Sequence, residues 1–318
     1  MRHDQATAAH PRSRRDLMAV MTVVLLASIF PVELVPSEPR NVSGIDGQFS
    51  GKQGQILVVT VPVEGVPTEV VGTFMERTIP FFIRPGRDHQ AHYTALLGLD
   101  MEDHPGRHTF TVDVKYPDTS RRRSYDILVM DEKFPVQHLR LPKDKVDLDE
   151  ESLVRVRAEQ EQVRAALSVL SSQRYWSGTF IEPVSGTVSG AFGRARIING
   201  ETKNPHNGED ISAPMGTDVV AMNDGVARLT VEHFFSGKGI FVDHGLGLYS
   251  MYFHLSEILV KDGEPVKRGQ VIGKVGASGR ASGPHLHLGV RLNGARVDPF
   301  ALIHLPTQEL IASTQSGG

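Results

Sequence analysis

The hydrophobic pattern of the chain is that of β-strands over most of its length. From residue 41 to residue 140, short apolar runs alternate with turn-forming stretches such as HPGRH. The run HTFTVDVKY, which ends at Tyr116, places its apolar residues on one face, because successive side chains of a strand point to opposite sides. Several such runs at short spacing predict a small antiparallel β-sandwich in this region.

The pattern changes to helical spacing between residues 141 and 177. Acidic residues open this stretch, as they do at many helix N-termini. Apolar residues then recur along one face, and the opposite face is charged. We therefore predict a helical linker, a spacer or strut between two domains. Its apolar positions are Leu153, Val156, Val163, Leu167 and Leu170.

A second β-rich region extends from residue 178 to residue 305. Its short strand-like runs are separated by glycine-rich turns, as in GTVSGAFG and DGEPVKRGQVIGKVG. This alternation of short strands and glycine-rich turns predicts an antiparallel β barrel-sandwich domain. The expected fold class is therefore mainly β, with two β domains joined by a helix. Residues 306–318 are polar and small and are expected to form a flexible tail.

The first 40 residues carry a different signal. An apolar run from Leu17 to Phe30 follows arginines at positions 12, 14 and 15. Basic residues before an apolar run of this length are typical of a signal peptide and place the rest of the chain outside. No clean cleavage site follows, so residues 1–40 are expected to be a signal peptide or an inner-membrane anchor. The expected location is the periplasm or cell envelope.

The composition limits both the binding partners and the residue types that could hold a metal. The net charge is −3, which gives no electrostatic basis for binding nucleic acid. The chain contains no cysteine. A transition-metal site would therefore have to use histidine, aspartate or glutamate.

Candidate ligands of that kind gather in the C-terminal region. In GPHLHLGV, His285 and His287 share one face of a strand, and leucines occupy the other face. The stretch NPHNGEDIS offers His206 and Asp210, and its Asn-Gly pair indicates a loop that enters a strand. Each pair is weak by itself, but together they indicate a metal site.

Further histidines stand in the same region. His254 in LYSMYFHLS would share a face with Tyr252 if the strand alternates regularly. Tyr252 would then either line a groove or pack in the core. We expect His244 to make structural hydrogen bonds in a turn and His233 to lie in a surface loop. His304 stands after the last of the candidate motifs.

In this order, the motifs HxxxD, YxHLS and GPHLH resemble those of the lysostaphin-like (LytM-type) zinc metalloendopeptidases, which cut peptidoglycan. The stretches SGAFG, APMGTDVVAMNDGVA and VDPF are also similar to that family, so the similarity covers about residues 180–302. The region before it, with YTALLGLD and HPGRHTFTV, resembles the immunoglobulin-like domain that some Gram-negative members carry.

The resemblance implies a site and a cofactor. His206, Asp210 and His287 would bind one zinc ion per chain, and His254 and His285 would stay off the metal and assist catalysis. Spacing alone leaves open which histidine of the HxH pair is the ligand. Two neutral histidines and one carboxylate leave zinc a fourth position for water. Which of His254 and His285 is the general base stays open, with His285 preferred.

The expected function is hydrolysis of peptide cross-links in peptidoglycan, with stem peptides as substrate. The alternative is a catalytically silent or self-inhibited wall-binding regulator of other hydrolases, and a third reading is a protease for ordinary proteins. Silent members of the family usually lose ligands, so the presence of all five residues favours the enzyme. The bond cut, the oligomeric state, any regulatory partner and the role of the N-terminal sandwich (positioning the enzyme or covering its groove) stay open.

Overall fold

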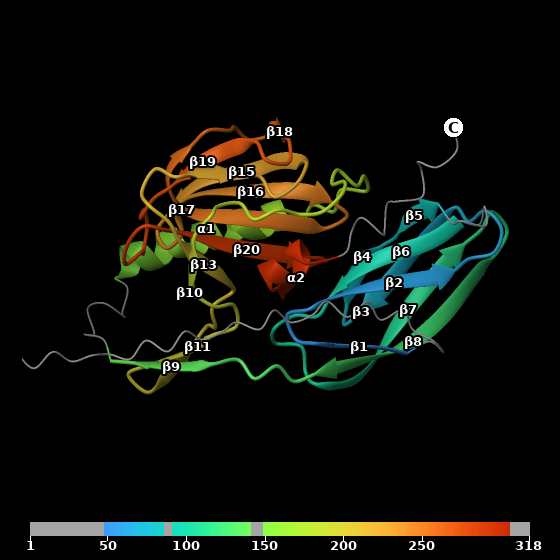
Figure 1. Cartoon of the computed structure of the whole chain (residues 1–318). Coiled ribbons are helices and arrows are strands. Elements are labelled where there is room, and N and C mark those ends of the chain that lie inside the picture. The colour runs from blue at the N-terminus through green and yellow to red at the C-terminus, as the bar shows by residue number, and fades with distance from the viewer. Residues whose placement is uncertain (1–47, 86–90, 141–148, 306–318) are drawn as a thin grey trace, which may run out of the picture. The chain divides into compact units, whose positions relative to one another are not determined.

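The computed structural model describes residues 48–85, 91–140 and 149–305 (Figure 1). The predicted signal or anchor segment 1–40 and the predicted tail 306–318 lie outside these residues. The described part of the chain is mainly β, as the sequence predicts. No helix within it combines the length and the apolar character that crossing a membrane requires.

The N-terminal strands form two sheets. A five-stranded sheet has the order β1-β8-β7-β3-β4, and a three-stranded sheet has the order β2-β6-β5. Apolar side chains of both sheets enclose one core, as in a sandwich. The immunoglobulin-like type stays a prediction. The bounds are β1 (Gln48–Lys52), β2 (Ile56–Pro62), β3 (Glu69–Phe74), β4 (Arg77–Pro80), β5 (Phe82–Pro85), β6 (Ala91–Gly98), β7 (Gly106–Lys115) and β8 (Ser120–Met130).

The C-terminal strands form a ten-stranded sheet with the central order β10-β13-β20-β17-β16-β15-β18 (Figure 1). Strand β14 pairs with β19, β19 also pairs with β17, and β21 pairs with β20. The bounds are β10 (Thr187–Gly190), β13 (Gly208–Ser212), β14 (Asp218–Val220), β15 (Gly225–His233), β16 (Gly237–Gly245), β17 (Leu248–Ile258), β18 (Pro265–Val266), β19 (Val271–Val275), β20 (His285–Leu292) and β21 (Ala295–Val297), followed by α2 (Pro299–Ile303).

The two faces of strand β20 have different environments. Leu286 and Leu288 are fully buried in the main core of the C-terminal region, where Tyr252 of β17 also packs. His285 and His287 point to the opposite face, as their spacing predicts. The apolar core on one side therefore fixes which side chains the other side presents.

Helix α1 (Glu150–Leu167) packs on the ten-stranded sheet. Its N-cap Asp149 accepts a hydrogen bond from the Ser152 amide, and its first turn carries two glutamates. Its apolar residues pack against a small cluster formed by Leu229, Val231, Phe241 and Met251. The helix thus covers part of the sheet instead of standing apart as a strut, and it ends before Leu170, which is 46% exposed.

A third, small sheet precedes the loop that carries His206. It has the order β12-β11-β9, with β9 (Val136–Leu139) parallel to β11 (Ala195–Ile198) and β12 (Glu201–Lys203) antiparallel to it (Figure 1). The chain that follows the N-terminal sheets therefore adds a strand to the hairpin that precedes His206.

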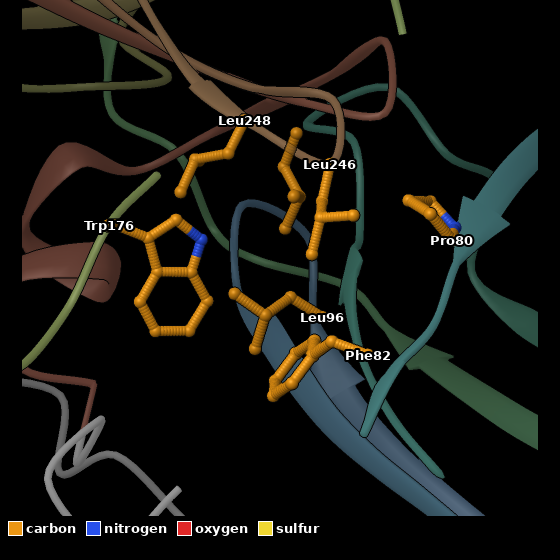
Figure 2. Close-up of a pocket in the computed structure, with 7 residues that line it drawn as sticks. Pro80, Phe82, Leu96, Trp176, Leu246 and Leu248 are labelled. Carbon is orange, nitrogen blue, oxygen red and sulfur yellow. The ribbon is translucent and has the colours of Figure 1, made fainter. Parts of the chain in front are cut away.

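The N-terminal strands also contact the C-terminal region directly. Figure 2 shows Phe82 and Leu96 facing Trp176, Leu246 and Leu248 around an apolar pocket. The Asp100 carboxylate accepts hydrogen bonds from the Arg296 guanidinium at 2.6 and 3.0 Å. None of the five predicted site residues lines this pocket, so it is a packing feature and not part of the site.

Candidate metal centre

Three predicted ligands converge on one point. His206 Nε2 lies 3.0 Å from Asp210 Oδ1 and 3.0 Å from His287 Nδ1. His287 Nδ1 lies 2.8 Å from Asp210 Oδ1. Among the described residues, these three form the group of histidine and carboxylate side chains that could hold a metal ion.

Strand pairing explains why they meet. Strands β13 and β20 are antiparallel, and the register places Asp210 opposite His287 and Ser212 opposite His285. Directly paired residues of an antiparallel pair project to the same face with their Cβ atoms about 5 Å apart. His206 precedes β13 in a loop, as the Asn-Gly pair predicts, and folds back to meet Asp210.

The loop that carries Ala191 orients His206. His206 Nδ1 donates a hydrogen bond to the Ala191 carbonyl oxygen at 3.0 Å. Since a neutral imidazole carries one N–H, Nε2 keeps its lone pair for the site. The next amide, Phe192 N–H, donates to Glu209 Oε1 at 2.9 Å, so a buried carboxyl fixes this loop. Burial raises the pKa of Glu209 to about 8.

Two glycines allow the close approach of these side chains. A Cβ atom at Gly190 would lie 2.3 Å from Asp210 Oδ2, and one at Gly208 would lie 2.7 Å from His287 Nε2. Both distances are far below van der Waals contact. The positions next to the candidate ligands therefore require glycine for reasons of space.

The electrostatics of the group favour a cation. Burial opposes ionisation of Asp210, but the neighbouring His206 and His287 rings outweigh burial and hold its pKa well below the usual range. Burial lowers the pKa of His287, which favours the neutral ring. Two neutral imidazoles and one carboxylate match a zinc donor set, whose atoms lie about 3.3 Å apart in tetrahedral coordination. The close approach of these three atoms, whose lone pairs would repel one another without a cation, therefore fits a metal.

His254 and His285 lie beside this group. Their ring centroids are 4.7 Å apart, and His254 lies 6.0 Å from the His287 ring. His285 Nε2 is 3.7 Å from Asp210 Oδ1. His254 Nδ1 donates to the Ser278 carbonyl and His285 Nδ1 to the Gly283 carbonyl, both at 2.8 Å. In both rings Nε2 is then the nitrogen without a proton.

The position of His254 depends on a β-bulge. Lys238 pairs with Leu255 and Ile240 with Tyr252, so Gly239 alone faces Phe253 and His254. His254 has φ +62°, in the left-handed region that few residues other than glycine adopt. The prediction that Tyr252 and His254 share a face is therefore wrong, because the extra residue re-aims His254 toward the site. Burial lowers the pKa of His254 to about 4.

The remaining residues singled out from the sequence have structural environments. Tyr252 is fully buried and its hydroxyl accepts a hydrogen bond from the Met222 amide, so it packs and does not line a groove. His244 is fully buried and donates to the Asp224 carbonyl, so the predicted structural hydrogen bond is present, but the residue lies in strand β16 and not in a turn. His304 is exposed. His233 is buried because α1 covers it, with Gln162 as its partner, so its predicted surface position is wrong.

The sequence reasoning did not identify the groups that support the site. The Ala191 carbonyl has no side-chain signal, and Glu209 resembles any strand glutamate. A weak signal existed at Glu209, because it stands two residues before the apolar Ile211 in a short strand and so shares the face of that buried residue. The hydroxyls of Ser189 and Ser212, 2.9 Å apart, extend the polar face along β10 and β13.

Comparison with known proteins agrees with this site. The sequence model of peptidase family M23 matches residues 204–299, which contain all five predicted residues. A crystal structure described as a putative peptidase M23 from Pseudomonas aeruginosa is 32% identical, with a TM-score of 0.63, and the match covers 79% of this chain and 94% of that one. The chain belongs to peptidase family M23.

Curated relatives match over shorter stretches. The peptidoglycan DD-endopeptidase ShyA of Vibrio cholerae is 45% identical over 94 residues, which is 30% of this chain and 22% of that protein. The DD-carboxypeptidase/endopeptidase Mpg of Neisseria meningitidis is 40% identical over 134 residues, 42% of this chain and 31% of that protein. The matched stretch thus spans less than a third of either relative.

Proposed function

We propose that this chain is a zinc metalloendopeptidase that hydrolyses peptide cross-links of peptidoglycan. The observation that carries the proposal is the convergence of His206 Nε2, Asp210 Oδ1 and His287 Nδ1 within 3.0 Å of one another, beside two further imidazoles. The names of the relatives in Vibrio and Neisseria support the substrate class.

His206, Asp210 and His287 would hold the metal. A bound zinc ion would supply a Lewis acid that lowers the pKa of water and polarises a carbonyl group. The Ala191 carbonyl keeps the proton of His206 on Nδ1, away from the site. The Asp210 carboxylate supplies the negative charge that a cation needs in this buried position.

His285 and His254 would handle protons. Both rings are fixed by a carbonyl oxygen at Nδ1, so Nε2 is the atom that can accept a proton from attacking water. His285 Nε2 is the nearer to the ligand Asp210, at 3.7 Å from Oδ1, which supports His285 as the base. The proton that His285 Nε2 takes from the water is the one that the leaving amine needs, and we assign its delivery to the His254–His285 pair, whose ring centroids lie 4.7 Å apart.

We also propose that the enzyme acts in the periplasm or cell envelope, where peptidoglycan lies. The apolar run 17–30 after three arginines supports export. Whether this run remains as an inner-membrane anchor depends on cleavage, which N-terminal sequencing of the mature protein would determine.

The proposal is tested by zinc analysis together with digestion of purified sacculi. The wild-type chain should split the cross-linked muropeptides of the sacculus into separate products. His206→Ala should form no such products and should lose its zinc. The variant His304→Ala, at an exposed histidine outside the site, should behave as the wild type. Zinc-loaded wild type that binds sacculi without releasing product would favour the silent or self-inhibited regulator instead.

A further inference from the structure

Ser212 lies on the face of the sheet that carries the candidate site. Strand pairing places it directly opposite His285, and the neighbouring pair on the same face is Asp210 with His287. Directly paired residues project to one face with their Cβ atoms about 5 Å apart. Ile211 is buried on the other face, and Ser212 is exposed. The Ser212 side chain is therefore the next group along the strand after the candidate metal ligands, beside the proposed base.

A β-bulge brings a second serine to this hydroxyl. The pairing of β10 with β13 shifts between Val188 and Gly190, so Ser189 is an extra residue in the register. Bulges of this kind re-aim a side chain and are frequent next to active sites. This bulge keeps Gly190 opposite Asp210, where space requires glycine, and places the Ser189 hydroxyl 2.9 Å from Ser212 Oγ.

The two hydroxyls form a hydrogen-bond chain with a fixed direction. Ser189 Oγ lies 3.3 Å from the Asp210 carbonyl oxygen, which can only accept, so Ser189 donates its single proton there. Ser212 Oγ must then donate its own proton to Ser189 Oγ. The exposed Ser212 oxygen keeps its lone pairs and has no proton left to offer. It therefore presents a hydrogen-bond acceptor beside His285.

We propose that Ser212 Oγ binds a backbone N–H of the substrate peptide close to the bond that is cut. This assignment rests on the proposed peptidase function. Residues that share a face of a strand are about 7 Å apart, so a peptide that runs along β13 from the metal ligands reaches Ser212 after one or two residues. Ser189 is a positioning residue, because it holds the Ser212 proton away from the substrate. A carboxylate or carbonyl oxygen is disfavoured at this point, since it would meet lone pairs.

The test removes the N–H from the substrate and the acceptor from the enzyme. Cross-linked peptides are synthesised with one backbone amide replaced by an ester, at the first or second position on either side of the scissile bond. An ester keeps the shape of the chain but lacks the N–H. We measure kcat/KM and zinc content for the wild type, Ser212→Ala, Ser212→Thr and Ser189→Ala. The matched control is Ser120→Ala, because Ser120 is an exposed strand serine in β8, outside the site.

On the all-amide peptide, Ser212→Ala should lower kcat/KM by about five-fold, the usual effect of losing one neutral hydrogen bond. In the wild type, one of the ester peptides should show a loss of similar size, and the same ester should cause no further loss in Ser212→Ala. Ser212→Thr keeps the hydroxyl and should retain most of the activity. Ser189→Ala should lose less than Ser212→Ala, and Ser120→Ala should match the wild type. All variants should keep the wild-type zinc content.

The results that would overturn the assignment are distinguishable from failure of the proposed function. If Ser212→Ala cleaves the all-amide peptide as well as the wild type does, Ser212 binds no substrate N–H and the peptidase function stands. The same conclusion follows if every ester changes kcat/KM by the same factor in both proteins. If the zinc-loaded wild type cleaves neither the peptides nor sacculi, the proposed function fails and the assignment fails with it.

Discussion

The imidazole rings of His254 and His285 lie with their centroids 4.7 Å apart, although they come from different strands, β17 and β20. Each ring is oriented by a backbone carbonyl at Nδ1. Neither ring contributes a nitrogen atom to the group formed by His206, Asp210 and His287. The two residues proposed to be catalytic therefore lie outside the candidate metal ligands.

Replacing either His254 or His285 by alanine should separate catalysis from metal binding. We expect activity on sacculi to fall by about 100-fold or more, the usual effect of losing a general acid or base. Zinc content should remain at the wild-type level, because the three donor atoms are retained. Muropeptide release and elemental analysis measure the two quantities. Loss of zinc in either variant, with His304→Ala unchanged, would show that the residue is a ligand after all.

Gly190→Ala should weaken metal binding although it replaces none of the candidate ligands. The added Cβ would lie 2.3 Å from Asp210 Oδ2 and would displace the carboxylate. We expect zinc affinity to fall by about ten- to 100-fold, the range seen when groups that orient metal ligands are lost. Competition with a chromophoric chelator measures it. Ser189→Ala, one residue away, is the matched control, and equal affinities for both variants would contradict the steric argument.

The buried His244 should cause the free energy of unfolding to fall at acidic pH. Its ring is fully buried, and burial lowers its pKa to about 4. In the unfolded chain the pKa is about 6.5, so between these values the unfolded state binds the extra proton. Stability is full above pH 6.5 and is lost as the pH falls toward 4, by about 3 kcal/mol at most.

Urea unfolding of the metal-free protein at pH 7.5 and pH 4.5 measures this effect. His244→Asn keeps an N–H donor for the Asp224 carbonyl and removes the titration. The difference in unfolding free energy between wild type and variant should shrink as the pH falls. A difference that is the same at both pH values would show that His244 does not contribute to the acid sensitivity.

Asp100→Asn should destabilise the contact between the N-terminal strands and the C-terminal sheet. The Asp100 carboxylate accepts two hydrogen bonds from the Arg296 guanidinium and one from its amide, and Arg296 also pairs with Glu102. Removing the charge leaves a half-buried guanidinium without its main partner. We therefore expect the free energy of unfolding to fall by about 3 kcal/mol.

The control for this prediction is Asp113→Asn. Asp113 pairs with Arg122, whose side chain is 69% exposed, and such pairs contribute about 1 kcal/mol or less. Calorimetric or urea unfolding of both variants gives the comparison. Equal losses would mean that the Asp100–Arg296 pair is no stronger than a surface ion pair.

Regular strands were predictable from the sequence, and departures from regularity were not. In β20 the alternation of His285 and His287 with leucines is uninterrupted, so the two faces follow from period two. In β17 the same reasoning failed at His254, because a bulge opposite Gly239 inserts one residue. A bulge depends on the register of two strands far apart in sequence, which a single run of residues does not encode.

The five candidate residues could be picked out from the sequence because they lie in motifs with recognisable spacing, and the roles assigned to them stay predictions. The groups that hold these residues in place could not be predicted, because they are backbone groups and residues brought close by long-range packing. The Ala191 carbonyl meets His206 only after the loop before β13 folds back. His233 was expected at the surface, but α1 covers it from 71 residues away in the chain.

The central claim is that His206, Asp210 and His287 together hold one metal ion. The most direct measurement is zinc per chain in exhaustively dialysed protein, for the wild type beside Asp210→Asn and His285→Ala. The account predicts about one zinc per chain in the wild type and in His285→Ala, and close to none in Asp210→Asn, whose side chain no longer supplies the negative charge of the donor set. Full zinc in Asp210→Asn, or none in the wild type, would contradict it.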